Sequence, residues 1–369
     1  MTSDLSDAVS TGDRSPQALP EDDADSEAGG AVAGSDATAD DAGVEWEDGS
    51  AGTDDDEPLR VLNLVTNDDA RFYKQQVSVL EDLGVSCTTL AVPSDREHGA
   101  GGVDGRSVED YVRFYPQTLK RSFEDFDLIH ANYGLTGPAA VLQPNLPVVL
   151  SLWGSDLLGT YGPVSKLCAR RSDAVIVMSD QMADALGQDC HVIPHGVDLD
   201  KFAPQPQRAA QEELGWDPDA RHVLFPYARS KTVKNPARAE RVVAAARERL
   251  ANSVELQTVS GVPHDRMPTY MNAADALLLT SDREGSPNSV KEAMACNLPV
   301  VSTDVGDVRQ RLSGVRHSFV GLDDAELVDC LVSILDAGVE SNGREVVREL
   351  SVERTGEQIR DVYRDVVES

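Results

Sequence analysis

Two glutamates with seven residues between them, Glu284 and Glu292, are the residues whose spacing points most directly to chemistry. They lie in the stretch DREGSPNSVKEAMACNLPVVSTDVG (282–306), directly after an apolar run, ALLLT (276–280), that predicts a strand. One carboxylate therefore precedes a predicted helix and the other lies on its second turn. The two can hold one ligand from opposite ends.

The start of that helix supplies the rest of a binding site. Ser286 is expected to cap a helix whose first position is Pro287, where a missing N–H costs nothing. Unpaired N–H groups and the helix dipole favour a phosphate or a sugar hydroxyl there, and Gly285 lets a ligand approach the backbone closely. The candidate binding residues at this helix start are Gly285, Ser286, Pro287, Asn288 and Ser289.

The motif EGSPNSVKEAMACNLPVV resembles that of glycosyltransferase family 4, whose members are retaining enzymes of the GT-B fold that use nucleotide sugars. The resemblance implies that Glu284 orients the donor sugar and that Glu292 holds the ribose of the nucleotide. It also implies a same-face reaction in which the leaving phosphate takes the acceptor's proton, without a glycosyl-enzyme. In a chain with 64 acidic residues the spacing alone would mean little, so the intervening GSPN and the following EAMA carry the argument.

A cationic turn supports the same reading. HVLFPYARSKTVKN (222–235) predicts a strand followed by a turn with Arg229, Lys231 and Lys234. The family places an Arg and a Lys at such a turn against the donor diphosphate, and Arg229 and Lys234 match by position, while Lys231 could substitute for either. Fixed cations there would favour the transition state, because charge gathers on the leaving diphosphate.

The first half of the chain departs more from the family. The segment TNDDARFYKQQ (66–76) lacks the paired glycines that relatives often carry there, and its Arg71 is a candidate for an anionic acceptor or a plain helix start. Asp156 in WGSD is a candidate for the acceptor side. Trp153 stands where many relatives have His, and His195 where Asn is commoner, so neither takes over a family role.

Short apolar, β-branched runs alternate with helix-length segments along the chain, which is typical of parallel sheets with crossover helices. The predicted strands are 60–65, 85–92, 127–131, 147–152, 174–178, 190–194, 222–228, 254–261, 276–280 and 299–303, with helices over 72–83 and 236–250. The fold class is therefore α/β. With the resemblance it becomes GT-B, two Rossmann-like domains facing a cleft, preceded by a disordered acidic N-terminal tail.

The predicted boundaries follow the changes in composition. Residues 1–58 hold 18 acidic residues and one base, Arg14, and cannot bury enough apolar area to fold, so we expect a disordered tail. Residues 59–204 predict the acceptor domain and 205–350 the nucleotide-sugar donor domain. Residues 351–369 predict a C-terminal helix that packs back toward the first domain.

The formal net charge of −31 argues against nucleic-acid binding, because phosphate contacts need clustered cations. This acidic excess, with only 7 lysines, resembles haloarchaeal-type proteins adapted to molar salt. Five separated cysteines and no long apolar run favour a cytoplasmic protein. The segment RFYPQTLKRSF (113–123) combines cations and aromatics, so either it contacts the inner face of the membrane or it is a crossover helix.

We expect no metal and no cofactor besides the nucleoside-diphosphate sugar substrate. Three acidic DxD-like triplets (125–127, 198–200 and 217–219) are frequent by chance in so acidic a chain. The predicted activity is hexosyl transfer to a glycan, lipid-linked or small-molecule acceptor. Two alternatives remain open, a GT-B-type nucleotide-sugar epimerase and a catalytically silent nucleotide-sugar-binding subunit.

Overall fold

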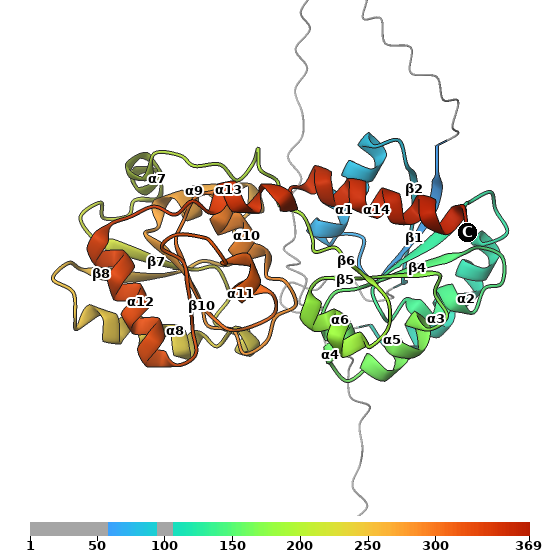
Figure 1. The fold of residues 1–369 in the computed structure, drawn as a ribbon, viewed down its shortest axis with the longest axis horizontal. Helices are drawn as coiled ribbons and strands as arrows, with labels where there is room; N and C mark the ends of the chain where they lie inside the picture. The colour runs from blue at the N-terminus through green and yellow to red at the C-terminus, as the bar shows by residue number, and fades with distance from the viewer. Residues whose placement is uncertain (1–57, 94–105) are drawn as a thin grey trace, which may run out of the picture.

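A computed structural model describes residues 58–93 and 106–369. Apart from Pro58, the acidic tail predicted over residues 1–58 lies outside the described residues. Two parallel sheets, each covered by helices, stand side by side (Figure 1). In the part of the chain that is described, no helix is both long and apolar enough to cross a bilayer.

The first sheet has six parallel strands in the order β2-β1-β3-β4-β5-β6. Its central strands are buried along nearly their whole length, which explains why they are continuous apolar runs rather than alternating ones. The strands are β1 (Arg60–Val65), β2 (Ser86–Ala91), β3 (Leu128–Asn132), β4 (Val148–Leu152), β5 (Ala174–Val177) and β6 (His191–Val192).

Helices cover both faces of this sheet (Figure 1). One face carries α1 (Arg71–Asp82) and the last helix, α14 (Val352–Val367), which contact each other. The other face carries α2 (Val108–Arg121), α3 (Gly137–Val141) and α5 (Gly162–Ala169), while the short α4 (Ser155–Leu158) and α6 (Asp180–Leu186) follow β4 and β5. The chain therefore returns to the first sheet after completing the second. The hydroxyl of Tyr363 in α14 lies 2.6 Å from Nδ1 of His130 in β3.

The second sheet repeats the arrangement with five parallel strands in the order β11-β10-β9-β7-β8. Its strands are β7 (Arg221–Phe225), β8 (Val254–Thr258), β9 (Ala276–Leu279), β10 (Val300–Thr303) and β11 (Phe319–Gly321). Its α-helices are α7 (Gln207–Leu214), α8 (Pro236–Arg247), α9 (Met267–Ala273), α10 (Asn288–Ala295), α11 (Val308–Arg311), α12 (Asp324–Ala337) and α13 (Gly343–Val347). Short 3-10 turns cover Thr232–Lys234, His264–Arg266 and Arg348–Leu350.

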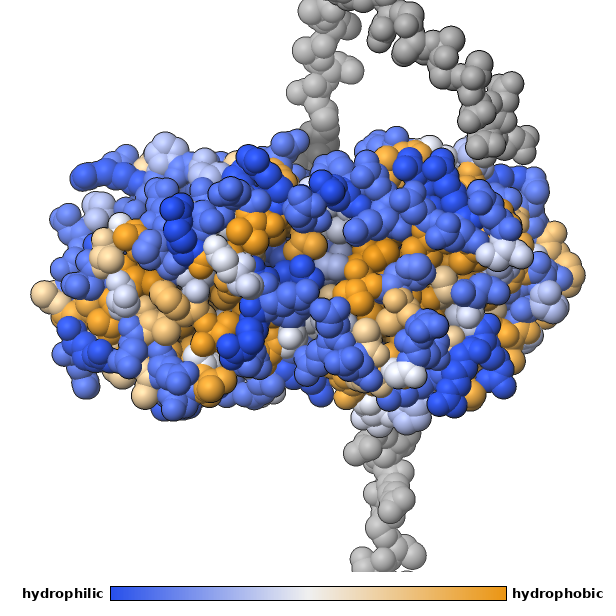
Figure 2. Space-filling view, viewed as in Figure 1, coloured by the Kyte–Doolittle hydropathy of each residue, from blue (hydrophilic) through white to orange (hydrophobic). Residues whose placement is uncertain are grey.

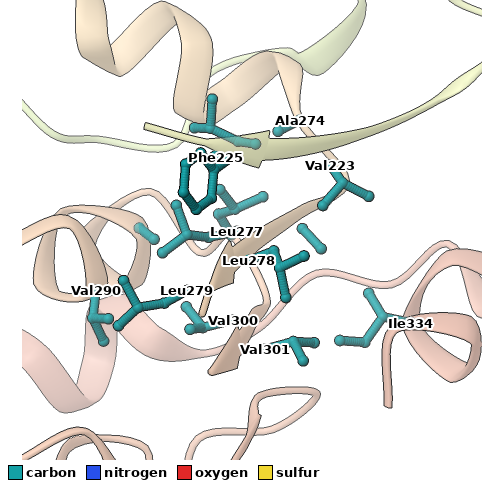
Figure 3. Close-up of a cluster of buried hydrophobic side chains, with 14 of the residues drawn as sticks. Val223, Phe225, Ala274, Leu277, Leu278, Leu279, Val290, Val300, Val301 and Ile334 are labelled. Carbon is teal, nitrogen blue, oxygen red and sulfur yellow. The ribbon is translucent and has the colours of Figure 1, made fainter. Parts of the chain in front are cut away.

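The core of the second sheet lies between its strands and the flanking helices (Figure 3). Phe225 of β7, Leu277 of β9 and Val300 of β10 are almost fully buried. Val290 of α10 and Ile334 of α12 pack onto them. Burying α10 in this way fixes the helix that carries the second glutamate of the motif.

All ten strands predicted from the sequence form, with ends displaced by a few residues, and the α/β fold class is confirmed. The edge strand β11 was not predicted, because its three residues are too few for a periodic pattern. In both sheets the first strand of the domain lies between the second and third, so the strand order reverses beside β1 and beside β7. Ligands of such open sheets bind at the carboxyl ends of the strands next to this reversal.

Candidate functional site

The turns that follow β4 and β9 touch each other where the two domains meet. A Cβ atom placed on Gly285 would lie 2.8 Å from the backbone oxygen of Trp153 and 3.7 Å from Cα of Gly154. A side chain at position 285 would therefore clash with the backbone of the opposite domain, whether or not a ligand also approaches this glycine. Strand ends from both sheets therefore face one seam.

Glu284 is held by side chains at this seam. Nζ of Lys234 donates to both carboxylate oxygens of Glu284, at 2.8 and 3.0 Å, and the hydroxyl of Ser281 donates to Oε1 at 2.5 Å. The side chains of Lys234 and Glu284 are 9% and 10% exposed, so the pair is largely shielded from water. Fifty positions separate the two residues, and the carboxyl ends of β7 and β9 bring them together.

An aromatic side chain completes the setting of Lys234. Its ammonium lies 4.4 Å from the centre of the Tyr227 ring, an arrangement that favours a cation. The hydroxyl of Tyr227 shares a 2.5 Å hydrogen bond with the hydroxyl of Ser289 in α10. Ser289 therefore holds the Tyr227 ring in place beside Lys234.

The predicted cap of α10 is wrong. The helix begins at Asn288, one residue later than expected, because Pro287 has an extended backbone with ψ of 120°. The hydroxyl of Ser286 donates to Oδ2 of Asp307 at 2.8 Å instead of capping the helix. Asn288 is left at the first helical position, and its Oδ1 is buried without a hydrogen-bond partner.

Glu292 lies on α10 and faces residues from both domains. Its Oε1 accepts a hydrogen bond from Nε2 of His264 at 2.9 Å and lies 3.6 Å from Nη2 of Arg71 at the start of α1. Burial by itself would raise the pKa of the Glu292 carboxyl, but the His264 hydrogen bond and the nearby charges of His264, Arg71 and Lys291 lower it overall. Glu292 is therefore held as a carboxylate.

The residue before it, Lys291, connects the domains. Its side chain is 1% exposed, and its Nζ donates to the backbone oxygen of His195 at 2.6 Å. Burial lowers the pKa of Lys291 to about 8. The ring of His195 stacks on Phe72 with centres 4.4 Å apart, and burial with the Lys291 charge lowers its pKa to about 3.

The other predicted cations lie differently. Arg229 has a side chain 68% exposed, and its Nη1 pairs with Oε1 of Glu240 in α8 at 2.8 Å. Lys231 precedes the 3-10 turn that carries Lys234. Of the two predicted diphosphate cations, the structure brings only Lys234 next to Glu284.

The carboxylate of Asp156 is held by backbone N–H groups of neighbouring loops. Its two carboxylate oxygens accept N–H groups of Trp153, Gly154 and Gly134, at 2.8 to 3.1 Å, and the residue is 1% exposed. Burial raises the pKa of Asp156, while these backbone hydrogen bonds lower it, and the net shift is upward. This carboxylate fixes the turn after β4, where Gly154 has φ of 144°.

A pocket opens between the domains beside Glu292. It is lined from the first domain by Arg71, Phe72 and Gln75, and from the second by His264, Asn288 and Glu292. Several buried polar atoms around the seam have no hydrogen-bond partner: Trp153 Nε1, His195 Nε2, His264 Nδ1, Asn288 Oδ1 and Asp307 Oδ1. Because unpaired buried polar atoms are costly, these atoms favour a polar ligand at the seam.

The acidic triplets have local partners. Oδ1 of Asp198 accepts the N–H of Asp200, and Oδ1 of Asp217 accepts the N–H of Asp219. Asp125 pairs with Arg60. Among residues 58–93 and 106–369, no group of three or more His, Cys, Asp or Glu is placed to hold a metal ion.

Sequence reasoning missed His264, Lys291, Ser281 and Tyr227. Lys291 stands inside the motif, but its spacing predicts an ordinary helical position. His264 lies in a loop whose residue types carry no signal, and it reaches Glu292 only because that loop, between β8 and α9, runs beside α10. Gly261 and Pro263 nearby indicate a turn, but they do not indicate what His264 contacts.

Two family models match separate parts of the chain. Residues 73–201 match Glycosyltransferase Family 4, and residues 232–337 match Glycosyl transferases group 1. The chain is 27% identical over 234 residues to the putative teichuronic acid biosynthesis glycosyltransferase TuaC of Bacillus subtilis, covering 55% of this chain and 60% of that protein. It is 26% identical over 275 residues to D-inositol 3-phosphate glycosyltransferase 2 of Catenulispora acidiphila, covering 58% and 63%. The matched part thus spans about three fifths of each relative.

Solved structures share the fold. Sucrose-phosphate synthase from Thermosynechococcus elongatus superposes with a TM-score of 0.65 at 19% identity, covering 83% of this chain and 98% of that one. HepE of Anabaena, solved in complex with UDP and glucose, superposes with a TM-score of 0.60 at 16% identity, covering 83% and 100%. The predicted GT-B fold of two Rossmann-like domains is confirmed.

Proposed function

We propose that this chain, similar to family 4 glycosyltransferases over residues 73–201 and to group 1 glycosyltransferases over residues 232–337, transfers a sugar from a nucleoside-diphosphate sugar to an acceptor with retention at the anomeric carbon. The observation that carries the proposal is the Glu284 carboxylate, held by Lys234 and Ser281 directly opposite the first domain. It stands where strand ends of two open sheets converge, which is the usual ligand site of this architecture.

Lys234 supplies the charge that the reaction needs. When the bond between sugar and diphosphate breaks, negative charge gathers on the leaving phosphate, and a fixed ammonium in a shielded site stabilises it strongly. Arg229 joins Lys234 once its exposed side chain leaves Glu240 and turns to the diphosphate. With these two cations we propose that transfer needs no divalent ion, so activity should persist in EDTA.

Glu284 orients the sugar and Glu292 holds the ribose in this proposal. Glu292 suits hydroxyl groups because it is a buried carboxylate already turned toward the pocket by His264 and Arg71. The acceptor enters from the first domain, where Arg71 and the turn fixed by Asp156 face the seam. Its class is a glycan, a lipid-linked sugar or a small molecule.

Two variants test these roles. With UDP-, GDP- and ADP-sugars as donors, Glu284→Ala should lower kcat at least 100-fold while the Kd for the free nucleotide changes less than threefold. Glu292→Ala should instead raise the nucleotide Kd at least tenfold, because a charge-assisted hydrogen bond to the ribose is lost. The matched control is Glu248→Ala, an exposed glutamate at the end of α8.

The product analysis separates the competing activities. Transfer with retention gives free nucleotide and a glycoside of unchanged anomeric configuration. An epimerase gives an altered nucleotide sugar, and a silent subunit gives neither product. Equal behaviour of the two glutamate variants, or an inverted product, would contradict the proposal.

A further inference from the structure

Lys291 is a buried lysine at the boundary between the two domains. The residue is 1% exposed and has one of the largest fully buried side chains in the described parts of the chain. Lysine is almost never buried unless its charge has a partner. The acids whose charges act on it, Glu292 and Asp307, are paired with other residues. The contact that accounts for the burial is the 2.6 Å hydrogen bond from its Nζ to the backbone oxygen of His195.

The oxygen to which Lys291 donates lies in a connection between the domains. The chain leaves the first domain after β6 and returns to it before α14. These two connections run beside each other: the N–H of Val197 donates to the oxygen of Leu350 at 2.8 Å, and the N–H of Val352 donates to the oxygen of Val197 at 3.2 Å. A Cβ atom on Gly196 would lie 2.6 Å from Cα of Val352. The two connections are therefore packed closely against each other.

The first of these connections also contacts α1. The ring of His195 stacks on the ring of Phe72 in α1, with centres 4.4 Å apart. Arg71, the residue before Phe72, lies 3.6 Å from Glu292. Lys291 in turn directly precedes Glu292 in α10. Two neighbouring contacts therefore join α1 to α10: one is the ion pair of Arg71 with Glu292, and the other runs from Phe72 through the connection to Lys291.

The two contacts differ in strength. The Arg71 side chain is 32% exposed and its guanidinium stands 3.6 Å from Glu292, so this ion pair contributes little by itself. The Lys291 ammonium is shielded from water, where a charge-assisted hydrogen bond is strong and costly to leave unmade. On the face shown in Figure 2, most side chains along the boundary between the domains are hydrophilic. Domains that meet through polar surfaces move against each other unless a specific contact holds them, and Lys291 makes such a contact.

We propose that Lys291 is a positioning residue, which holds the connection at His195, and with it α1, at a fixed place opposite Glu292. It does not line the pocket beside Glu292, so it takes no direct part in a reaction there. The placement of α1 is independent of the proposed function. Its consequence for activity rests on that function, in which Glu292 binds the donor and Arg71 in α1 faces the acceptor.

Hydrogen exchange of the full chain without ligand tests the placement. Lys291→Met gives a side chain of similar length that cannot donate, so the two connections should separate more often. The amides of Val197 and Val352, which we call the connection amides, should then exchange at least tenfold faster than in the wild type, because their hydrogen bonds join the two connections. The buried amides of β9 should keep their rates, since that strand lies in the core of the second domain.

A matched control removes a similar contact inside one domain. Nε of Arg247 in α8 also donates to a backbone oxygen, that of Val254, at 2.6 Å. Arg247→Met should therefore leave exchange at the connection amides unchanged. Phe72→Leu interrupts the path from the side of the first domain and should speed exchange at the connection amides at least threefold. This variant decides the matter if circular dichroism shows that Lys291→Met does not fold.

The consequence for activity is measured separately. The Kd of Lys291→Met for UDP, GDP or ADP should stay within threefold of the wild-type value, because Glu292 and α10 remain in place. Turnover of the sugar nucleotide that the wild type uses best should fall at least tenfold, because α1 is no longer held opposite Glu292. A variant that is merely damaged in α10 would lose nucleotide affinity as well as turnover.

The outcomes separate the positioning role from the proposed function. A wild type that binds none of these nucleotides and turns over no sugar nucleotide contradicts the proposed function, and the exchange rates still decide the positioning role. That role is overturned if the connection amides of folded Lys291→Met exchange like those of the wild type, if the amides of β9 accelerate equally, or if Arg247→Met has the same effect. It is also overturned if the nucleotide Kd of Lys291→Met rises as much as that of Glu292→Ala.

Discussion

Two turns face each other at the seam, and each contains one shielded carboxylate that is held in a different way. In the turn after β4, Asp156 accepts backbone N–H groups from its own turn and from Gly134. In the turn after β9, Glu284 accepts from the side chains of Lys234 and Ser281. Backbone groups cannot turn away without unfolding the loop, whereas side chains can exchange partners.

We expect this contrast to separate a structural acid, Asp156, from the acid that the proposed function assigns to the donor, Glu284. Asp156 has used its acceptor capacity on the fold and keeps the first domain's edge rigid. Glu284 and Lys234 are hydrogen-bonded to each other, and in the proposed function both turn to a donor that carries hydroxyls and phosphates. Burial alone would not distinguish them, since both carboxylates are largely shielded.

The largest effect expected from this contrast concerns the cations of the second domain. Lys234→Ala should lower kcat/KM 100- to 1,000-fold, because it removes a shielded charge next to the reacting centre. Arg229→Ala should lower it no more than about tenfold, since the exposed side chain must first leave Glu240. Steady-state kinetics with the best donor measures both.

A Lys234→Arg variant tests whether charge alone suffices. Its activity should stay well below that of the wild type, because a planar guanidinium does not reproduce the contacts of the ammonium with Glu284 and the Tyr227 ring. If Arg229→Ala is the more damaging variant, Arg229 is the principal diphosphate cation and the ranking is wrong.

The second effect concerns the two acids and stability. Asp156→Asn should lower the free energy of unfolding by about 2–3 kcal/mol, because an amide nitrogen would face backbone N–H groups that need an acceptor. Glu284→Gln should lower it less and should remove activity, because the amide oxygen can still accept a hydrogen bond from Lys234 although the shielded ammonium loses its charged partner. Thermal denaturation and urea titration of both variants compare them directly. Equal destabilisation would show that Glu284 is as structural as Asp156.

The smallest effect concerns how the free energy of unfolding depends on pH, through a histidine buried in the core of the first domain. His130 is fully buried between Tyr363 and Ser151, and burial lowers its pKa to about 3 from 6.5. The unfolded chain therefore binds the proton that the folded one excludes, so stability falls as pH drops below 6.5 toward 3. Between pH 6.5 and 5 this group should remove about 2 kcal/mol.

The control is His130→Gln, which cannot titrate. It should be less stable than the wild type at pH 7, and the gap should narrow as the pH falls to 5. A gap that stays constant over this interval would contradict the buried neutral histidine.

Much of the fold was predictable because strands and helices follow from the local spacing of apolar residues. The apolar runs at 60–65 and 276–280 announce strands, and Phe72 onward repeats apolar positions at helical spacing. The motif from Glu284 to Glu292 correctly predicted that the first glutamate precedes a helix and that the second lies on it. Family resemblance extended these elements to the GT-B fold. The local pattern predicted the wrong first residue and the wrong cap for α10, because the extended backbone of Pro287 decides where this helix begins.

By itself, the sequence determined which residues form strands and helices and that two glutamates frame the start of α10. Only the tertiary structure decided which side chains meet: Lys234 with Glu284, His264 and Arg71 with Glu292, and Arg229 with Glu240. The physical reason is that periodicity records whether a residue faces the core of its own element. Which residues of different elements meet, such as Lys234 and Glu284 at 50 positions, depends on how parallel strands bring their carboxyl ends to one edge and on how the two domains pack against each other.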